Sequence, residues 1–155
     1  MSTRVYIMFG GNIGNVEATF AEAEKYLGSH GLHFDQKSSI HPSAAVDCVP
    51  GTPDFKDQAL SGIWNGTARE LLELLQQTER HFGRPANHRS DMSRTLDCDI
   101  IFFGNQVVNE PDLIIPHPRM HNRLFVLEPL FEIAPDFIHP VLNRQVSQIL
   151  KGYKK

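Results

Sequence analysis

The chain has few cysteines and no long apolar run. Its 155 residues include two cysteines, Cys48 and Cys98, which are too few for a disulfide framework. The apolar stretch at residues 5–9 is about a quarter of the length of a membrane-spanning helix, and it is too short for the core of a secretory signal. We therefore expect a cytoplasmic protein without a membrane-spanning or export segment, in which both thiols stay reduced.

A surplus of positive charge is also missing. Lys and Arg number 15 against 18 Asp and Glu, so the formal net charge is −3, whereas proteins that bind nucleic acid usually carry a basic surplus. The hydrophobic fraction of 41% is that of an ordinary soluble protein, and a chain of this length fits one domain. We therefore expect a single domain over residues 1–155, a monomer that acts on small molecules and binds neither nucleic acid nor membrane.

The apolar pattern predicts strands and helices in irregular alternation. β-Branched and aromatic runs predict strands, and apolar residues at helical spacing behind a capping side chain predict helices. The predicted strands are residues 5–9, 32–40, 55–64 and 96–103, with residues 106–108 pairing back on the last as a hairpin. The predicted helices run from Asn15 to the glycines at 28 and 31, from the capping box 67–70 to Gly83 and Pro85, over 123–133, and near 146–150. This order favours an α+β class over a doubly wound parallel sheet.

Three segments lack regular periodicity. Residues 41–53 contain three prolines, residues 84–93 are polar, and residues 111–122 are rich in proline and irregular. Loops of about a dozen residues within a small domain are often functional. We expect residues 41–54 and 84–93 to close over substrates during turnover.

The sharpest chemical signal is a pair of aspartates, Asp97 and Asp99, in a predicted strand. Residues i and i+2 of a strand share one face, so the two carboxylates lie side by side while Leu96, Cys98 and Ile100 face the core. Neighbouring carboxylates repel each other unless a cation lies between them, and Mg²⁺ is commonly held by one or two carboxylates together with substrate phosphates. The alternative is two surface aspartates at a strand end.

Basic residues gather in the loops around this pair. They are Arg84, Arg89, Arg94, His117, Arg119 and Arg123. The planar guanidinium group of arginine suits phosphate oxygens, so acidic strand and basic loops together predict a site for a magnesium-bound nucleotide. Neither G-x-x-x-x-G-K-[ST] nor G-x-G-x-x-G occurs in the sequence, and the glycines at 10–14 are better explained by a tight turn. Any binding of ATP must therefore use an uncommon framework.

Four motifs resemble those of the 6-hydroxymethyl-7,8-dihydropterin pyrophosphokinases of folate biosynthesis. They are G-G-N-I-G at 10–14, R-T-L-D-C-D-I at 94–100, I-P-H-P-R-M at 115–120 and R-L-F-V-L-E-P-L-F-E-I-A-P at 123–135. The resemblance runs from about residue 4 to residue 150. It implies a ferredoxin-like α+β fold with an antiparallel or mixed sheet flanked by helices. The implied reaction transfers a diphosphate from ATP to the hydroxymethyl group of the pterin and releases AMP.

The resemblance also implies roles for individual residues. Asp97 and Asp99 would hold two Mg²⁺ ions, and Arg84 and Arg94 would steady the charge of the migrating phosphoryl group. The implied contacts with ATP are Gln76, Glu79, Ile100, His117 and Arg123. The implied contacts with the pterin are the loop backbone at Ser43, Ala44 and Val46, the rings of Phe55 and Phe125, and Asp57.

The chain departs from the family pattern in two places. Asp57 stands where the family usually has asparagine, and an ionised carboxylate accepts hydrogen bonds but cannot donate them. Residues 90–95, S-D-M-S-R-T, stand where the family commonly has R-W-G-P-R-T, so a lid tryptophan and an arginine are missing. Two alternatives therefore stay open: the same chemistry on a modified pterin or related heterocycle, and a non-catalytic protein that binds pterin or nucleotide.

Overall fold

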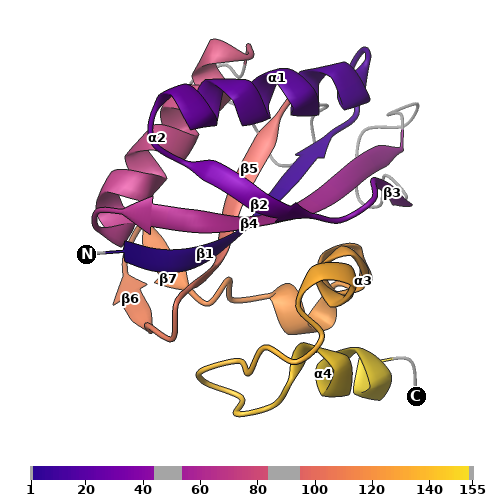
Figure 1. The fold of residues 1–155 in the computed structure, drawn as a ribbon. Helices are drawn as coiled ribbons and strands as arrows, with labels where there is room; N and C mark the ends of the chain where they lie inside the picture. Colours follow the sequence, from indigo (N-terminus) through magenta and orange to yellow (C-terminus); the bar gives the residue numbers. More distant parts are fainter. Residues whose placement is uncertain (1, 44–53, 84–94, 154–155) are drawn as a thin grey trace.

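An antiparallel sheet with the strand order β2-β4-β1-β5 forms the centre of the fold, and the short strand β3 pairs with the start of β4 (Figure 1). The computed structural model describes residues 2–43, 54–83 and 95–153. The strands are β1 (Ser2–Gly11), β2 (His33–Lys37), β3 (His41–Ser43), β4 (Phe55–Asn65), β5 (Asp97–Phe103), β6 (Val108–Glu110) and β7 (Leu113–Ile115). The helices are α1 (Val16–Ser29), α2 (Ala68–His81), α3 (Leu124–Ile133) and α4 (Val146–Tyr153), with a 3₁₀ turn at Met120–Asn122.

The order β1-α1-β2-β4-α2-β5 gives the fold its class. It is the β-α-β-β-α-β arrangement of ferredoxin-like proteins, with β1 in the middle of the sheet and antiparallel to both neighbours. The predicted α+β, ferredoxin-like architecture is confirmed, and every strand pair among the described residues is antiparallel.

Two apolar layers cover the two faces of the sheet. Helices α1 and α2 lie on one face, and α3 and α4 lie on the other (Figure 1). Phe9 belongs to the apolar cluster under α1 and α2, whereas Tyr6 and Met8 belong to the cluster with α3 and α4. Because both faces are covered, β1 is apolar at consecutive positions rather than at alternate ones.

The predicted helix starts are confirmed. The Asn15 side chain accepts a hydrogen bond from the N–H of Ala18 at the start of α1. At the start of α2, Thr67 and Glu70 each accept the other's backbone N–H, which completes the predicted capping box. Helix α1 passes through Gly28 and ends one residue later. Within the described part of the chain, no helix combines the length and apolarity that crossing a bilayer requires.

The hairpin predicted from residues 106–108 onto the preceding strand is wrong. Strand β6 pairs with β7 instead of β5, so a strand and a 3₁₀ turn lie in the segment 111–122 that was expected to be irregular. Leu113 and Ile115 are buried in the core, and Arg69 of α2 forms ion pairs with Glu110 and Asp112. These contacts hold the small hairpin against α2.

The first part of the loop expected at 41–53 is a strand. Residues 41–43 form β3, in which Pro42 lies opposite Lys56; proline is tolerated there because, among the described strands, β3 pairs with β4 alone. Strand β2 is shorter than the predicted segment 32–40. Cys98 is buried on the core face, as expected, and Cys48 lies outside the described residues.

Gly62 allows β2 to pair closely with β4. A Cβ atom at Gly62 would overlap the backbone oxygen of His33, so Gly62→Ala must push β2 away and should lower the free energy of unfolding by about 1–3 kcal/mol. Gly28→Ala is the matched control, because its new methyl group meets only the movable ring of His33 and alanine favours the helix. Urea unfolding measures both; equal stabilities would contradict the packing described.

Candidate functional site

Three strands bring two aspartates into one row. Gly10 in β1 lies opposite Asp57 in β4 and opposite Asp97 in β5. Directly opposed residues point to the same face of a sheet, here the face that carries α3. A Cβ atom on Gly10 would lie 3.2 Å from Asp57 Oδ1 and 3.9 Å from Asp97 Cβ. The glycine therefore leaves space between the two carboxyl groups.

Asp99 lies in the next row on the same face. It is opposite Met8, two residues from Asp97, which corresponds to about 6.5–7 Å along the strand. Both aspartates are partly exposed. Cys98, which lies between them, and Ile100, which follows Asp99, are buried on the opposite face. The structure thus agrees with the face assignment made from the sequence, and the metal-binding role stays a prediction.

The pair fits the ligand chemistry of magnesium. Among the residues that the structure describes, no three or more His, Cys, Asp or Glu side chains are grouped to hold a metal ion. Mg²⁺ does not need such a group, because one or two carboxylates suffice when substrate phosphates and water complete its shell. Asp97 and Asp99 supply that donor set at an accessible place.

Glu79 of α2 holds the strand between the two aspartates. Its carboxylate is buried and accepts the backbone N–H of Cys98 at 2.8 Å. Among the described strands, β5 lies at the edge of the sheet, so some of its N–H groups point away from β1, and a buried N–H needs an acceptor. Glu79, which was predicted to contact ATP, therefore fixes the backbone that carries Asp97 and Asp99.

His117 stands near Asp97 in a basic neighbourhood. Its N–H bonds to the oxygen of Ile101 at 3.1 Å, which places it beside the end of β5. Burial, followed by the charges of Arg123 and Arg119, lowers the pKa of His117 to about 4, and only the charge of Asp97 opposes this shift. His117 is therefore a neutral imidazole at neutral pH.

The tautomer of His117 follows from its backbone contact. Its Nδ1 accepts the N–H of Arg119 at 3.4 Å, which places the proton on Nε2. A neutral N–H on Nε2 can donate one hydrogen bond to a nucleotide, but it contributes no positive charge.

Strands β3 and β4 hold the residues predicted to contact the pterin. Ser43 lies opposite Phe55, and its hydroxyl donates to Asp57 Oδ2 at 2.7 Å. Asp57 is only 5% exposed. Phe55 and Asp57 are two residues apart in β4 and so share the face on which Asp97 and Asp99 lie.

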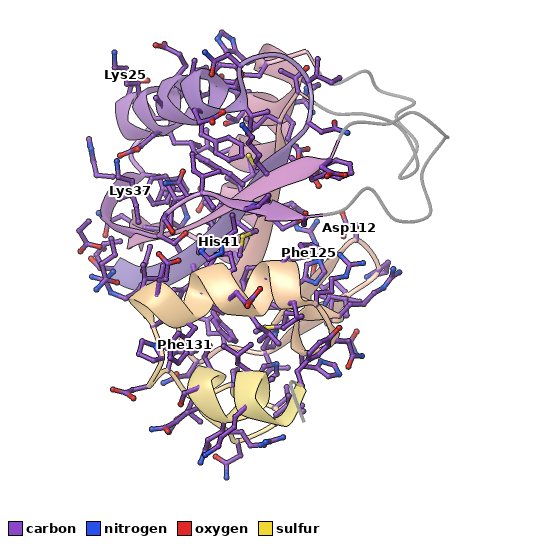
Figure 2. The ribbon with its side chains drawn as sticks, turned by 90° about the vertical axis from the view of Figure 1, so that its right-hand side faces the viewer. Lys25, Lys37, His41, Asp112, Phe125 and Phe131 are labelled. Atoms are coloured by element: carbon purple, nitrogen blue, oxygen red, sulfur yellow. The ribbon has the colours of Figure 1, made fainter. Side chains whose placement is uncertain are left out.

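Helix α3 presents the other predicted aromatic contact. Phe125 lies in the first turn of α3, at one end of that helix (Figure 2), and is 36% exposed. The guanidinium carbon of Arg123 lies 5.3 Å from the centre of its ring, a distance typical of a cation–π contact. A predicted ATP contact and a predicted pterin contact are therefore neighbours at the start of one helix.

The remaining predicted site residues fall into two groups. Gln76 lies exposed on α2, and the Ile100 side chain is in the core, so any contact of Ile100 with a nucleotide must involve its backbone. The other four, Arg84, Arg94, Ala44 and Val46, lie outside the described residues, as do most of the two loops expected to close.

Two features of the site were not predicted. Gly10 provides the space between Asp57 and Asp97, although its motif was explained as a tight turn. Glu132 of α3 bonds to Ser39 and His41, although Glu132 itself was assigned no role from the sequence. A glycine inside a strand can mark such a close approach, whereas no local pattern links Glu132 to residues more than 90 positions away.

Comparisons with known proteins agree with one another. A family model described as 7,8-dihydro-6-hydroxymethylpterin-pyrophosphokinase matches residues 6–135. The 2-amino-4-hydroxy-6-hydroxymethyldihydropteridine pyrophosphokinase of Bacillus subtilis is 37% identical over 149 residues, covering 96% of this chain and 88% of that protein. A folate synthesis bifunctional protein of Arabidopsis thaliana is 34% identical over 129 residues. That match covers 83% of this chain but spans only 26% of the much longer relative.

A solved structure supports the fold. The crystal structure of Plasmodium falciparum HPPK-DHPS with pteroate matches with a TM-score of 0.77 and 11% sequence identity. The match covers 99% of this chain and 42% of that one. At this identity the likeness concerns the fold alone.

The lowered pKa of His117 predicts a contribution to acid sensitivity. Because its folded-state pKa of about 4 lies below the ordinary 6.5, the unfolded chain binds more protons between these values, and stability is lost as the pH falls through that window. Between pH 7.5 and 5.0 the metal-free protein should lose of order 1–2 kcal/mol more than His117→Gln. Urea unfolding at both values measures this loss. His139, whose pKa is also lowered, is present in both proteins; identical losses would contradict the assignment.

Proposed function

The chain belongs to the 7,8-dihydro-6-hydroxymethylpterin-pyrophosphokinase family, and we propose on this basis that it transfers diphosphate from ATP to the hydroxymethyl group of 6-hydroxymethyl-7,8-dihydropterin. The hydroxyl oxygen attacks the β-phosphorus of ATP, the bond from that phosphorus to the oxygen bridging the α-phosphate breaks, and AMP leaves. The hydroxyl proton is released to the surroundings. The observation that carries the proposal is the pair Asp97 and Asp99 on one partly exposed face of β5, beside the Gly10 row.

In this proposal Asp97 and Asp99 hold two magnesium ions. When bound, magnesium neutralises the charge of the ATP phosphates and of the phosphoryl group in transfer. The support is the shared face of the carboxylates and the bond from Cys98 to Glu79, which fixes the strand between them. Phosphoryl transfer depends on positioning and charge neutralisation more than on covalent help from the protein, and a backbone fixed in this way suits that requirement.

The remaining proposed contacts with ATP come from α2, from β5, from the segment after β7 and from residues outside the described part of the chain. Arg84 and Arg94 steady the migrating phosphoryl charge, and Arg123 binds the nucleotide as a cation. His117 contributes a neutral hydrogen-bond donor, because burial holds its pKa near 4. Gln76, Glu79 and Ile100 complete the proposed nucleotide contacts.

The pterin lies between β3–β4 and α3 in this proposal. Phe55 and Phe125 contact the flat ring, and ring stacking contributes about 0.5–1.5 kcal/mol for each pair beyond burial. Ser43, Ala44 and Val46 contribute backbone contacts, and Asp57 binds the polar edge. We infer that the enzyme works as a cytoplasmic monomer on these small molecules, without nucleic acid.

The reaction and its metal site are tested together. We expect wild-type protein with ATP, Mg²⁺ and the pterin to form AMP rather than ADP, measured by chromatography. Asp97→Asn and Asp99→Asn should each lower the rate by at least about 100-fold, because each removes a negatively charged magnesium ligand. Asp112→Asn, which changes an exposed carboxylate paired with Arg69, should keep the wild-type rate. Full activity in either site variant would refute the metal assignment.

A second candidate function is the same transfer to a related heterocycle. The observation that favours it is Asp57, a buried carboxylate that accepts from Ser43 where the family pattern has asparagine. A carboxylate accepts two N–H groups side by side, but it repels a ring oxygen that asparagine would donate to. Asp57 therefore selects a heterocycle edge with adjacent N–H donors.

The selectivity of Asp57 can be measured with pterin analogues. A hydrogen bond to a charged group contributes about 1.5–3 kcal/mol, so a preference of wild type for the 2-amino pterin over its 2-oxo analogue of about 10- to 100-fold in kcat/KM would identify the pterin itself as the acceptor, and the absence of that preference would favour the related heterocycle. Asp57→Asn should reduce that ratio, whereas Asp54→Asn, an exposed aspartate just before β4, should not. An unchanged ratio in Asp57→Asn would remove the basis of this candidate. Nucleotide binding without AMP release would instead favour the non-catalytic alternative.

A further inference from the structure

One carboxylate on α3 binds the segment that leads into β3. Glu132 Oε1 accepts the backbone N–H of Ser39 at 2.8 Å, and the Ser39 hydroxyl lies 3.0 Å from Oε1 and 2.8 Å from Oε2. Oε2 also pairs with Nε2 of His41 in a short contact. Helix α3 and the β2–β3 segment are therefore joined through a single side chain.

The segment that Glu132 holds is part of the proposed pterin site. His41 lies opposite Asp57 in the β3–β4 register, and Ser43, two residues further on, donates to the same Asp57. Residues 39, 41 and 43 therefore place three polar side chains in one row along the segment, two bonded to α3 and one to β4.

The helix that carries Glu132 also carries the opposite side of that site. Phe125 lies in the first turn of α3 and Glu132 in the last. In Figure 2, His41 lies between the sheet and α3, and Phe125 lies at one end of the helix. The position of α3 along the sheet therefore sets the spacing between Phe125 and the residues of β3 and β4.

Helix stability does not explain a carboxylate at this position. The last turn of α3 contains no basic residue, and a negative charge near a helix C-terminus is unfavourable to the helix dipole. Burial raises the pKa of Glu132, but the hydrogen bonds from Ser39 and His41 outweigh it, so the pKa is lowered overall. Ser39 and His41, rather than helix α3 itself, therefore stabilise the negative charge of Glu132.

We propose that Glu132 is a positioning residue that aligns α3 with β3, so that Phe125 on one side and Ser43 and Asp57 on the other meet the heterocycle at a fixed spacing. The inference rests on the proposed function, because it assigns the two sides of the same pterin site. Glu132 itself does not touch the substrate. Its loss changes the geometry around the pterin and leaves Asp97 and Asp99, on β5, in place.

The test separates pterin binding from ATP binding. AMP formation is measured in Glu132→Gln with the pterin varied at saturating ATP, and again with ATP varied at saturating pterin. We expect KM for the pterin to rise about tenfold while KM for ATP stays within about twofold. Glu110→Gln is the matched control, since it also removes a carboxylate that joins two elements; it should leave both KM values unchanged. An unchanged KM for the pterin, or an equal rise in both values, would overturn the proposal.

A second variant distinguishes loss of the Glu132 contact from a general folding defect. His41→Gln removes the partner of Glu132 from the other side, and the double variant Glu132→Gln/His41→Gln should raise KM for the pterin no further than the worse single variant. Additive effects would show independent roles and would contradict the proposal. The pterin affinities of the same proteins, measured by calorimetry, distinguish failure of the positioning role from failure of the proposed function. Absence of AMP from wild type overturns the proposed function, whereas unchanged affinity in Glu132→Gln overturns the positioning role.

Discussion

The candidate site depends on the absence of a side chain at Gly10. Strand β1 is paired on both sides, so backbone hydrogen bonds fix β4 and β5 relative to it, and Asp57 and Asp97 face each other across Gly10, where no Cβ atom fills the space. Glu79 holds the outer edge of β5 through the N–H of Cys98. The acidic groups are therefore positioned by rigid strands rather than by loops, which is the more accurate way to hold a functional group.

The apolar layer under α3 ends where the acidic row begins. On this face of β5, Ile101 is buried in the cluster with α3, whereas Asp99 and Asp97, the next two residues on the same face, are partly exposed. Because residues on one face of a strand are two positions apart, a change from apolar to acidic side chains at one row is enough to turn a core surface into a binding surface. The same strand thus contributes to stability in one half and to the site in the other.

Patterns that act over short distances could be predicted from the sequence, and contacts between distant segments could not. The capping box at Thr67 and the shared face of Asp97 and Asp99 follow from spacings of two and three residues, and both are present in the structure. The predicted partner of β6 was wrong. The burial of Leu113 and the ion pairs of Arg69 decide that β6 pairs with β7 rather than β5, and a local sequence pattern contains neither. The contact of Glu132 with Ser39 is of the same kind. The family resemblance named residues for the site, but only the register of three strands explains why a glycine stands among them.

The charges around the site explain why a cation is needed there. Asp57, Asp97 and Asp99 lie on one face, and a triphosphate adds further negative charge, so direct binding of ATP to this surface would be repulsive. His117 does not relieve that repulsion, since burial and the neighbouring charges of Arg123 and Arg119 keep it neutral. Arg123 does supply a positive charge, and it also lies over the ring of Phe125, so the proposed nucleotide and pterin sides of the site meet at one side chain. In the proposed function, divalent cations held by Asp97 and Asp99 would convert the acidic face from one that repels phosphate into one that attracts it. Binding of ATP and binding of the metal are therefore expected to be coupled, each strengthening the other.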